Sequence, residues 1–141
     1  MKKKKQKIKY TNFTPVNLLG IVCFDRSYQI GWKINKTLNF NLVADEDILI
    51  KNKNETISFT SYFFEDEERM IFYRLIANHP ETSFFIKKLK NIDYVLLIQG
   101  ELTPDEINTL VKKLQKIESF RAVVKIDVEK LSLTMQKKLK L

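Results

Sequence analysis

The sequence is poor in the side chains that build disulfides and metal centres: it has one cysteine, Cys23, and one histidine, His79. A single cysteine excludes an intrachain disulfide framework and suits a reducing compartment. Cys23 lies in the apolar run from Leu18 to Phe24, so we expect a buried, unreactive thiol. A single histidine excludes multi-histidine metal sites, and His79 beside Pro80 is expected in a surface turn.

Glycine is equally scarce, and this excludes the glycine-rich phosphate-binding and nucleophile motifs. The three glycines, Gly20, Gly31 and Gly100, cannot form a P-loop, a dinucleotide-binding fingerprint or a nucleophile elbow. The pairs Asp25–Arg26 and Asp93–Tyr94 have no second acid or base placed beside them by the sequence. We therefore predict no catalytic residues and no cofactor, and we do not expect an enzyme.

No segment approaches the roughly 18 consecutive apolar residues that a membrane-spanning helix needs. The lysine-rich start followed by the apolar residues 16–24 has the outline of a signal peptide, but Val22 stands where a small residue must precede a cleavage-site cysteine. We expect no membrane association and a cytoplasmic location. The acidic run 65–68 lacks the glycine and the distal acid of a calcium loop, so we expect a solvated turn and no metal site.

The net charge of +8 belongs to the two ends of the sequence. Three lysines near the carboxyl end are Lys137, Lys138 and Lys140, and the candidate polyanion-binding residues near the amino end are Lys2, Lys3, Lys4, Lys5, Lys7 and Lys9. We predict a basic, flexible arm at 1–14, one domain at 15–130 and a basic tail at 131–141. The arm could contact RNA or DNA weakly through counterion release, although a solvated arm is the favoured interpretation.

Between the two ends, hydrophobic patterns predict an α+β domain. We expect helices at about 26–38 and 104–117; the first has a pattern that also fits a strand. Thr103 to Glu106 is a capping box with Pro104 at the first helical position. Strands are expected at 16–24, 48–50, 57–64, 70–77, 94–98 and 120–128, the last with Ala122, Val124 and Ile126 on one face. This order predicts a single mixed, mainly antiparallel sheet of about six strands with two helices packed on it.

The apolar run from Tyr94 to Ile98 is the best candidate for the central strand, because an unbroken run indicates burial on both faces. The stretch just before it, Ile86-Lys87-Lys88-Leu89-Lys90-Asn91-Ile92-Asp93-Tyr94, resembles the signature of the IPExxxVDY family, small proteins of Bacteroidetes. The signature residues are Ile86, Ile92, Asp93 and Tyr94; Ile92 replaces Val, and Lys87 and Lys88 stand where the family has Pro and Glu. The resemblance implies a fold and a bacterial cytosol, and it implies no chemistry.

The function expected from the sequence is a non-catalytic binding or protein-interaction module. Five aromatic residues of the expected hairpin, Tyr62, Phe63, Phe64, Phe72 and Tyr73, exceed what one sheet face can bury. A second covered face would follow from an internal covering element or from dimerisation. The partner is therefore expected to be another protein or a second copy, with nucleic acid as the alternative.

Overall fold

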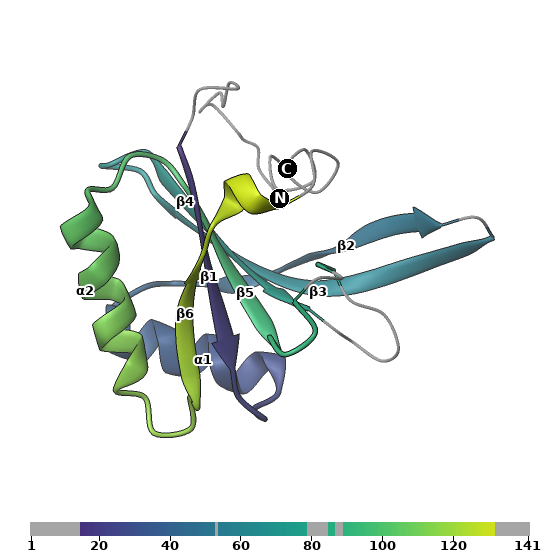
Figure 1. The fold of residues 1–141 in the computed structure, drawn as a ribbon, viewed down its shortest axis with the longest axis horizontal. Coiled ribbons are helices and arrows are strands. Elements are labelled where there is room, and N and C mark those ends of the chain that lie inside the picture. Colours follow the sequence, from purple (N-terminus) through teal and green to yellow (C-terminus); the bar gives the residue numbers. More distant parts are fainter. Residues whose placement is uncertain (1–14, 53, 79–84, 87–88, 132–141) are drawn as a thin grey trace.

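The computed structural model describes residues 15–52, 54–78, 85–86 and 89–131. Within them, the chain forms six strands and two α-helices around one sheet (Figure 1). Their bounds are β1 Val16–Val22, α1 Ser27–Leu38, β2 Val43–Asn52, β3 Glu55–Asp66, β4 Ile71–Ala77, β5 Tyr94–Gln99, α2 Pro104–Gln115 and β6 Ala122–Ile126. A short 3-10 helix, η1, follows at Val128–Lys130.

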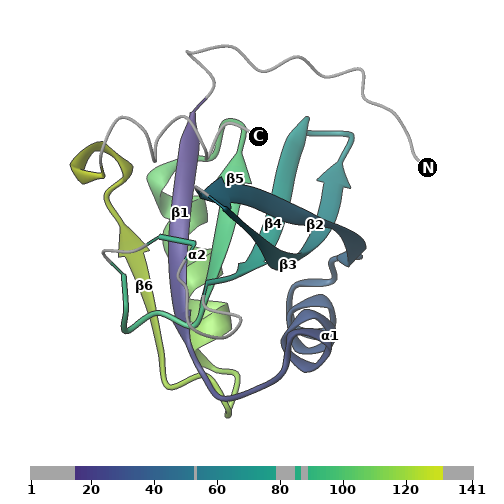
Figure 2. The same ribbon diagram turned by 90° about the vertical axis from the view of Figure 1, so that its right-hand side faces the viewer.

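The strands lie in the order β2-β3-β4-β5-β1-β6, and every neighbouring pair is antiparallel. The predicted α+β class is confirmed, while the described strands include no parallel pair. The predicted central strand is also confirmed: β5 lies between β4 and β1, and all six of its residues are buried. The sheet is strongly twisted, so that β2 and β3 run across the direction of β1 (Figure 2).

Both helices pack on the same face of the sheet. Ile30 and Ile34 of α1 and Ile107 and Leu114 of α2 join one core cluster with alternate residues of the strands, such as Leu96. The capping box of α2 is present as predicted, because the Thr103 hydroxyl accepts from the Glu106 N–H and the Glu106 carboxylate accepts from the Thr103 N–H. Helix α1 is likewise present, which decides the ambiguous pattern of residues 28–34.

The second face is covered by other parts of the same chain. Phe85, Ile86 and Ile92 form a second cluster there with Val95 and Leu97, the residues of β5 that alternate with those facing the helices. Leu131 joins this cluster and is buried, although the sequence predicted it as the first residue of a tail. The hairpin aromatics divide between the faces as expected: Tyr62, Phe64 and Tyr73 pack on the helix side, and Phe63 contacts Phe72 edge to face.

Several element bounds differ from the prediction. Strand β2 starts at Val43, well before the expected Ile48, and the β2–β3 hairpin projects from the body of the sheet (Figure 1). The first half of β2 contains a bulge between Asp45 and Ile48, and the Asp45 carboxylate forms an ion pair with Arg74 at 2.8 Å. The acidic residues of this segment are typical of a loop, and for this reason the sequence predicted a shorter strand. Met70 has a positive φ of 57° and lies in the turn, so β4 begins one residue later than predicted.

Neither described helix is long and apolar enough to cross a membrane.

Candidate functional site

The connection between β1 and α1 is held by two residues at the start of β5. The Asp93 carboxylate accepts a hydrogen bond from the Cys23 N–H at 3.0 Å. The Tyr94 hydroxyl donates to the Asp25 carbonyl at 2.6 Å. Because β5 is a buried central strand, these bonds connect the residues between β1 and α1 to the centre of the sheet.

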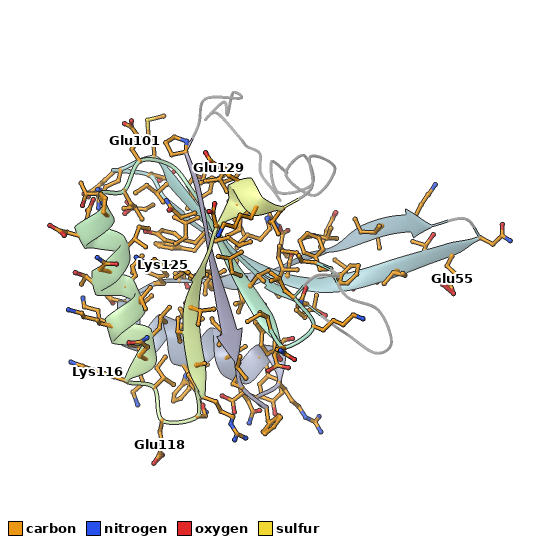
Figure 3. The ribbon with its side chains drawn as sticks, in the orientation of Figure 1. Glu55, Glu101, Lys116, Glu118, Lys125 and Glu129 are labelled. Atoms are coloured by element: carbon orange, nitrogen blue, oxygen red, sulfur yellow. The ribbon has the colours of Figure 1, made fainter. Side chains whose placement is uncertain are left out.

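The Asp25 side chain makes a second link, to α1 and to the turn before β6. Its carboxylate accepts from Lys33 Nζ at 2.9 Å and from the Ser119 hydroxyl at 2.6 Å. Burial opposes ionisation of Asp25, but the bonds from Ser119 and Lys33 outweigh it, and the pKa of Asp25 is lowered. The turn after α2, which Figure 3 marks by Lys116 and Glu118, is thereby fastened to the start of α1.

Helix α1 presents two faces of different chemistry. Ile30 and Ile34 are fully buried against the sheet. Tyr28, Trp32 and Lys36, spaced four residues apart, follow one another along the solvent side of the helix. The helix ends at Asn39, whose left-handed φ of 58° stops it directly after the turn that carries Lys36.

Three aromatic side chains at this place are turned to solvent. Phe24 is 82% exposed, Tyr28 64% and Trp32 61%, and no other aromatic side chain in the described part of the chain is exposed. A cationic side chain lies over each of two of these rings: Lys36 Nζ is 5.0 Å from the centre of the Trp32 ring, and the Arg121 guanidinium is 5.1 Å from the centre of the Phe24 ring. We call this surface, made of Phe24, Arg26, Tyr28, Trp32, Lys36 and Arg121, the aromatic corner.

The aromatic corner offers groups that can form non-covalent contacts. The neighbouring Cys23 thiol is only 2% exposed, and burial raises its pKa to about 11, so it stays protonated and unreactive at neutral pH. No group of His, Cys, Asp or Glu side chains suited to a metal ion occurs among the described residues. Exposed rings and cations can instead cover apolar groups and receive anions.

The four signature residues lie together at the entry to β5, and their contacts are structural. The Ile86 N–H donates to the Asn78 side-chain oxygen, and the Ile92 carbonyl accepts from the Asn78 amide. Asp93 and Tyr94 make the bonds to the corner described above. The pairs Asp25–Arg26 and Asp93–Tyr94 are far apart in the sequence, and in the structure the bond from Tyr94 to Asp25 joins them.

The lysines predicted to bind polyanions, 2–5, 7 and 9, lie outside the described residues. Three residues important for the corner were not identified from the sequence: Asn78, Ser119 and Arg121. Asn78 stands between the predicted strand 70–77 and the expected turn at His79, yet it is fully buried and its side chain makes three hydrogen bonds. A local signal exists for none of the three, because each acts on a segment far away in the sequence.

A scan of protein-family models and a search of curated proteins find no match to this chain. The fold and the corner define a small α+β protein with an open antiparallel sheet and an exposed aromatic and basic surface.

Proposed function

We propose that this protein is a non-catalytic interaction module that binds a partner protein through the aromatic corner. The observation that carries the proposal is the exposure of Phe24, just before α1, and of Tyr28 and Trp32, on the solvent side of α1; these are the exposed aromatic side chains of the described residues. Large aromatic side chains and arginine are enriched in protein interfaces and dominate their binding energy. Isolated exposed apolar residues are ordinary on a protein surface, but three exposed aromatic rings within residues 24–32 are not.

The rigid frame beneath the corner supports the same proposal. Hydrogen bonds hold the chain around Asp25 in place without a partner; they are made by Asp93, Tyr94, Lys33 and Ser119. A surface that is already ordered loses less conformational entropy on binding, so more of the contact energy contributes to affinity. The unreactive state of Cys23 agrees with binding as the role of this region.

The test replaces Tyr28 and Trp32 together by alanine, which keeps the helix because alanine has the highest helix propensity. The control replaces Leu49 and Val124, two exposed apolar residues on β2 and β6, by alanine. Proteins that copurify with the wild type and with the control, but not with the corner variant, are then purified and titrated by calorimetry. We expect a direct complex that the corner variant weakens by at least about tenfold, the loss of one hot-spot contact. Equal affinity of the corner variant for every reconstituted partner would contradict the proposal.

A second copy of the chain is the alternative occupant of the corner. Sedimentation velocity at high micromolar concentration distinguishes it: self-association at the corner gives a larger species that the double alanine variant returns to monomer. Nucleic acid binding through Lys2 to Lys9 is the other alternative from the sequence. It predicts an affinity that falls steeply with salt and that is lost when residues 1–9 are removed.

Membership of the IPExxxVDY family and a cytoplasmic location are also part of this proposal. Support for membership comes from the shared position of Ile86, Ile92, Asp93 and Tyr94, which join the segment before β5 to Asn78 and to the corner. If these residues form the signature of a family, their bonds should recur in the structure of another member. A different set of contacts in that member would argue against the assignment.

A further inference from the structure

We propose that the segment bound by the aromatic corner is acidic: aspartate or glutamate side chains of a partner protein contact Arg26, Lys36 and Arg121 while its apolar groups cover the rings. This inference rests on the proposed function and adds the chemistry of the partner.

The cations of the corner differ in whether they form ion pairs. Lys33 is paired with Asp25 at 2.9 Å, but the ion pairs of the described residues include neither Lys36, Arg26 nor Arg121. Of the nearby carboxylates, Asp25 is paired with Lys33 and accepts from Ser119, Asp93 accepts from the Cys23 N–H, and Glu118 is exposed in the turn before β6. The corner therefore carries more cations than carboxylates, Arg26, Lys33, Lys36 and Arg121 against Asp25, Asp93 and Glu118.

A second feature is the way two of these cations are held. The Arg121 guanidinium lies near the face of the Phe24 ring, and a guanidinium on a ring face keeps the N–H groups at its edge available for a carboxylate. Lys36 is placed similarly on Trp32. A partner that covers the rings also removes water from these cations, which strengthens a charge-assisted hydrogen bond to a carboxylate.

A third feature is the distribution of acids over the rest of the described surface. Apart from Glu118 in the turn before β6, exposed acidic residues lie away from the corner, at 45–47 in β2, at Glu55 at the tip of the projecting hairpin, at 67–68 in the turn before β4, and at Glu101 and Glu129 (Figure 3). Their field directs the anionic part of an approaching partner toward the corner. The same acids repel a long nucleic acid, whose binding requires many phosphate contacts along the surface, so the observations favour an acidic protein segment.

The experiment sorts a displayed library of short random peptides against the full-length protein. The comparison proteins are the Lys36→Gln/Arg121→Gln variant, which keeps the rings, and the Lys112→Gln/Lys113→Gln variant, which removes two exposed lysines of α2. The Tyr28→Ala/Trp32→Ala variant, which removes two of the rings, is included in the sorting. Selected peptides are then synthesised and titrated, with Trp32, the single tryptophan, as the fluorescent reporter at the site. A matched peptide with every acid replaced by its amide tests the charge directly.

We expect peptides rich in Asp and Glu with interspersed apolar residues. Their affinity should fall at least about tenfold with the Lys36/Arg121 variant and with the amide peptide, and should be unchanged with the Lys112/Lys113 variant, because a hydrogen bond to a charged group is worth that much. Corner-dependent selection of neutral or basic peptides would overturn this inference and leave the proposed function intact. Absence of any selection that depends on Tyr28 and Trp32 would overturn both. Tighter binding of oligothymidylate than of any acidic peptide, reported by Trp32, would assign the corner to nucleic acid instead.

Discussion

The Tyr94 hydroxyl donates a hydrogen bond of 2.6 Å to the backbone carbonyl of Asp25, which lies far earlier in the sequence. The bond joins the first residue of the central strand to the segment that carries Phe24. Burial raises the pKa of Tyr94, so the hydroxyl remains a donor throughout the neutral range. Through this contact, a residue of the signature resemblance determines the position of the proposed binding surface without belonging to it.

Replacing Tyr94 by phenylalanine tests this relationship. The change removes one hydroxyl and keeps the ring, so we expect the free energy of unfolding to fall by about 0.5–1.5 kcal/mol. Partner affinity should fall as well, because the chain around Phe24 loses one of its anchors. Urea titration gives the stability, and Tyr28→Phe, a change at an exposed tyrosine, is the control for stability alone. A stability equal to wild type would show that the bond contributes nothing in solution.

The Asp25 carboxylate should make stability depend on pH in the acid range. Its pKa in the folded protein is lowered, while an unfolded aspartate titrates near ~3.9. A group whose folded pKa is lower stabilises the fold at pH values above its unfolded pKa, and the contribution disappears as the pH falls through the folded value. We expect Asp25→Asn to lower the free energy of unfolding by about 1.5–3 kcal/mol at pH 7, the usual range for hydrogen bonds to a charged group.

The measurement compares urea midpoints of wild type and Asp25→Asn from pH 7 to pH 2. The difference between them should be constant above about pH 5 and should shrink below about pH 4. Glu101→Gln, at an exposed position that Figure 3 labels, is the control for a surface carboxylate. A difference that persists undiminished at the lowest pH would mean that packing, and not the charge, accounts for the effect of Asp25.

Asn78 is expected to be among the least replaceable polar residues. Its side-chain amide donates to the Leu89 and Ile92 carbonyls, each at 2.9 Å, and its oxygen accepts from the Ile86 N–H at 2.8 Å. Replacement by alanine leaves these three backbone groups without their partner, and each orphaned group costs about 1–3 kcal/mol. We expect a loss of at least about 3 kcal/mol in chemical denaturation, against a change within about 0.5 kcal/mol for the exposed Asn91→Ala. A loss below 1 kcal/mol would mean that water or a shifted backbone replaces the bonds.

The parts of the fold that could be predicted are those with a strong local pattern. The five-residue apolar run from Tyr94 has no stable place except the centre of a sheet, and the capping box at Thr103 specifies where α2 begins. Strand β2 was predicted too short because its acidic residues are typical of a loop. They lie in an edge strand, where a bulge and the partner Arg74 accommodate them, and that partner cannot be inferred from local sequence.

The candidate site could be predicted only in fragments. Tyr28 and Trp32 were assigned to a helix, but their exposure depends on which side of α1 packs on the sheet. Phe24 was expected inside the first strand, where its ring would be buried. Strand β1 ends at Val22 instead, and Arg121 from the segment before β6 lies against the exposed ring. Contacts between segments so far apart follow from the strand order β5-β1-β6, which hydrophobic periodicity does not specify.

The central position of β5 leads to the last prediction. Leu96 contributes to the core under the helices and Leu97 to the core on the opposite face, and both side chains are completely buried. Aspartate at either position would bury an unpaired carboxylate at a cost of several kcal/mol. Because domains of this kind are stable by roughly 5–15 kcal/mol, we expect Leu96→Asp and Leu97→Asp each to unfold most of the protein. Leu49→Asp, at a leucine of β2 that is 62% exposed, should change stability by no more than about 0.5 kcal/mol. Thermal melts followed by circular dichroism compare the three variants. A melting temperature close to wild type for either Leu96→Asp or Leu97→Asp would show that one face of β5 is open to water, contrary to a strand covered on both sides.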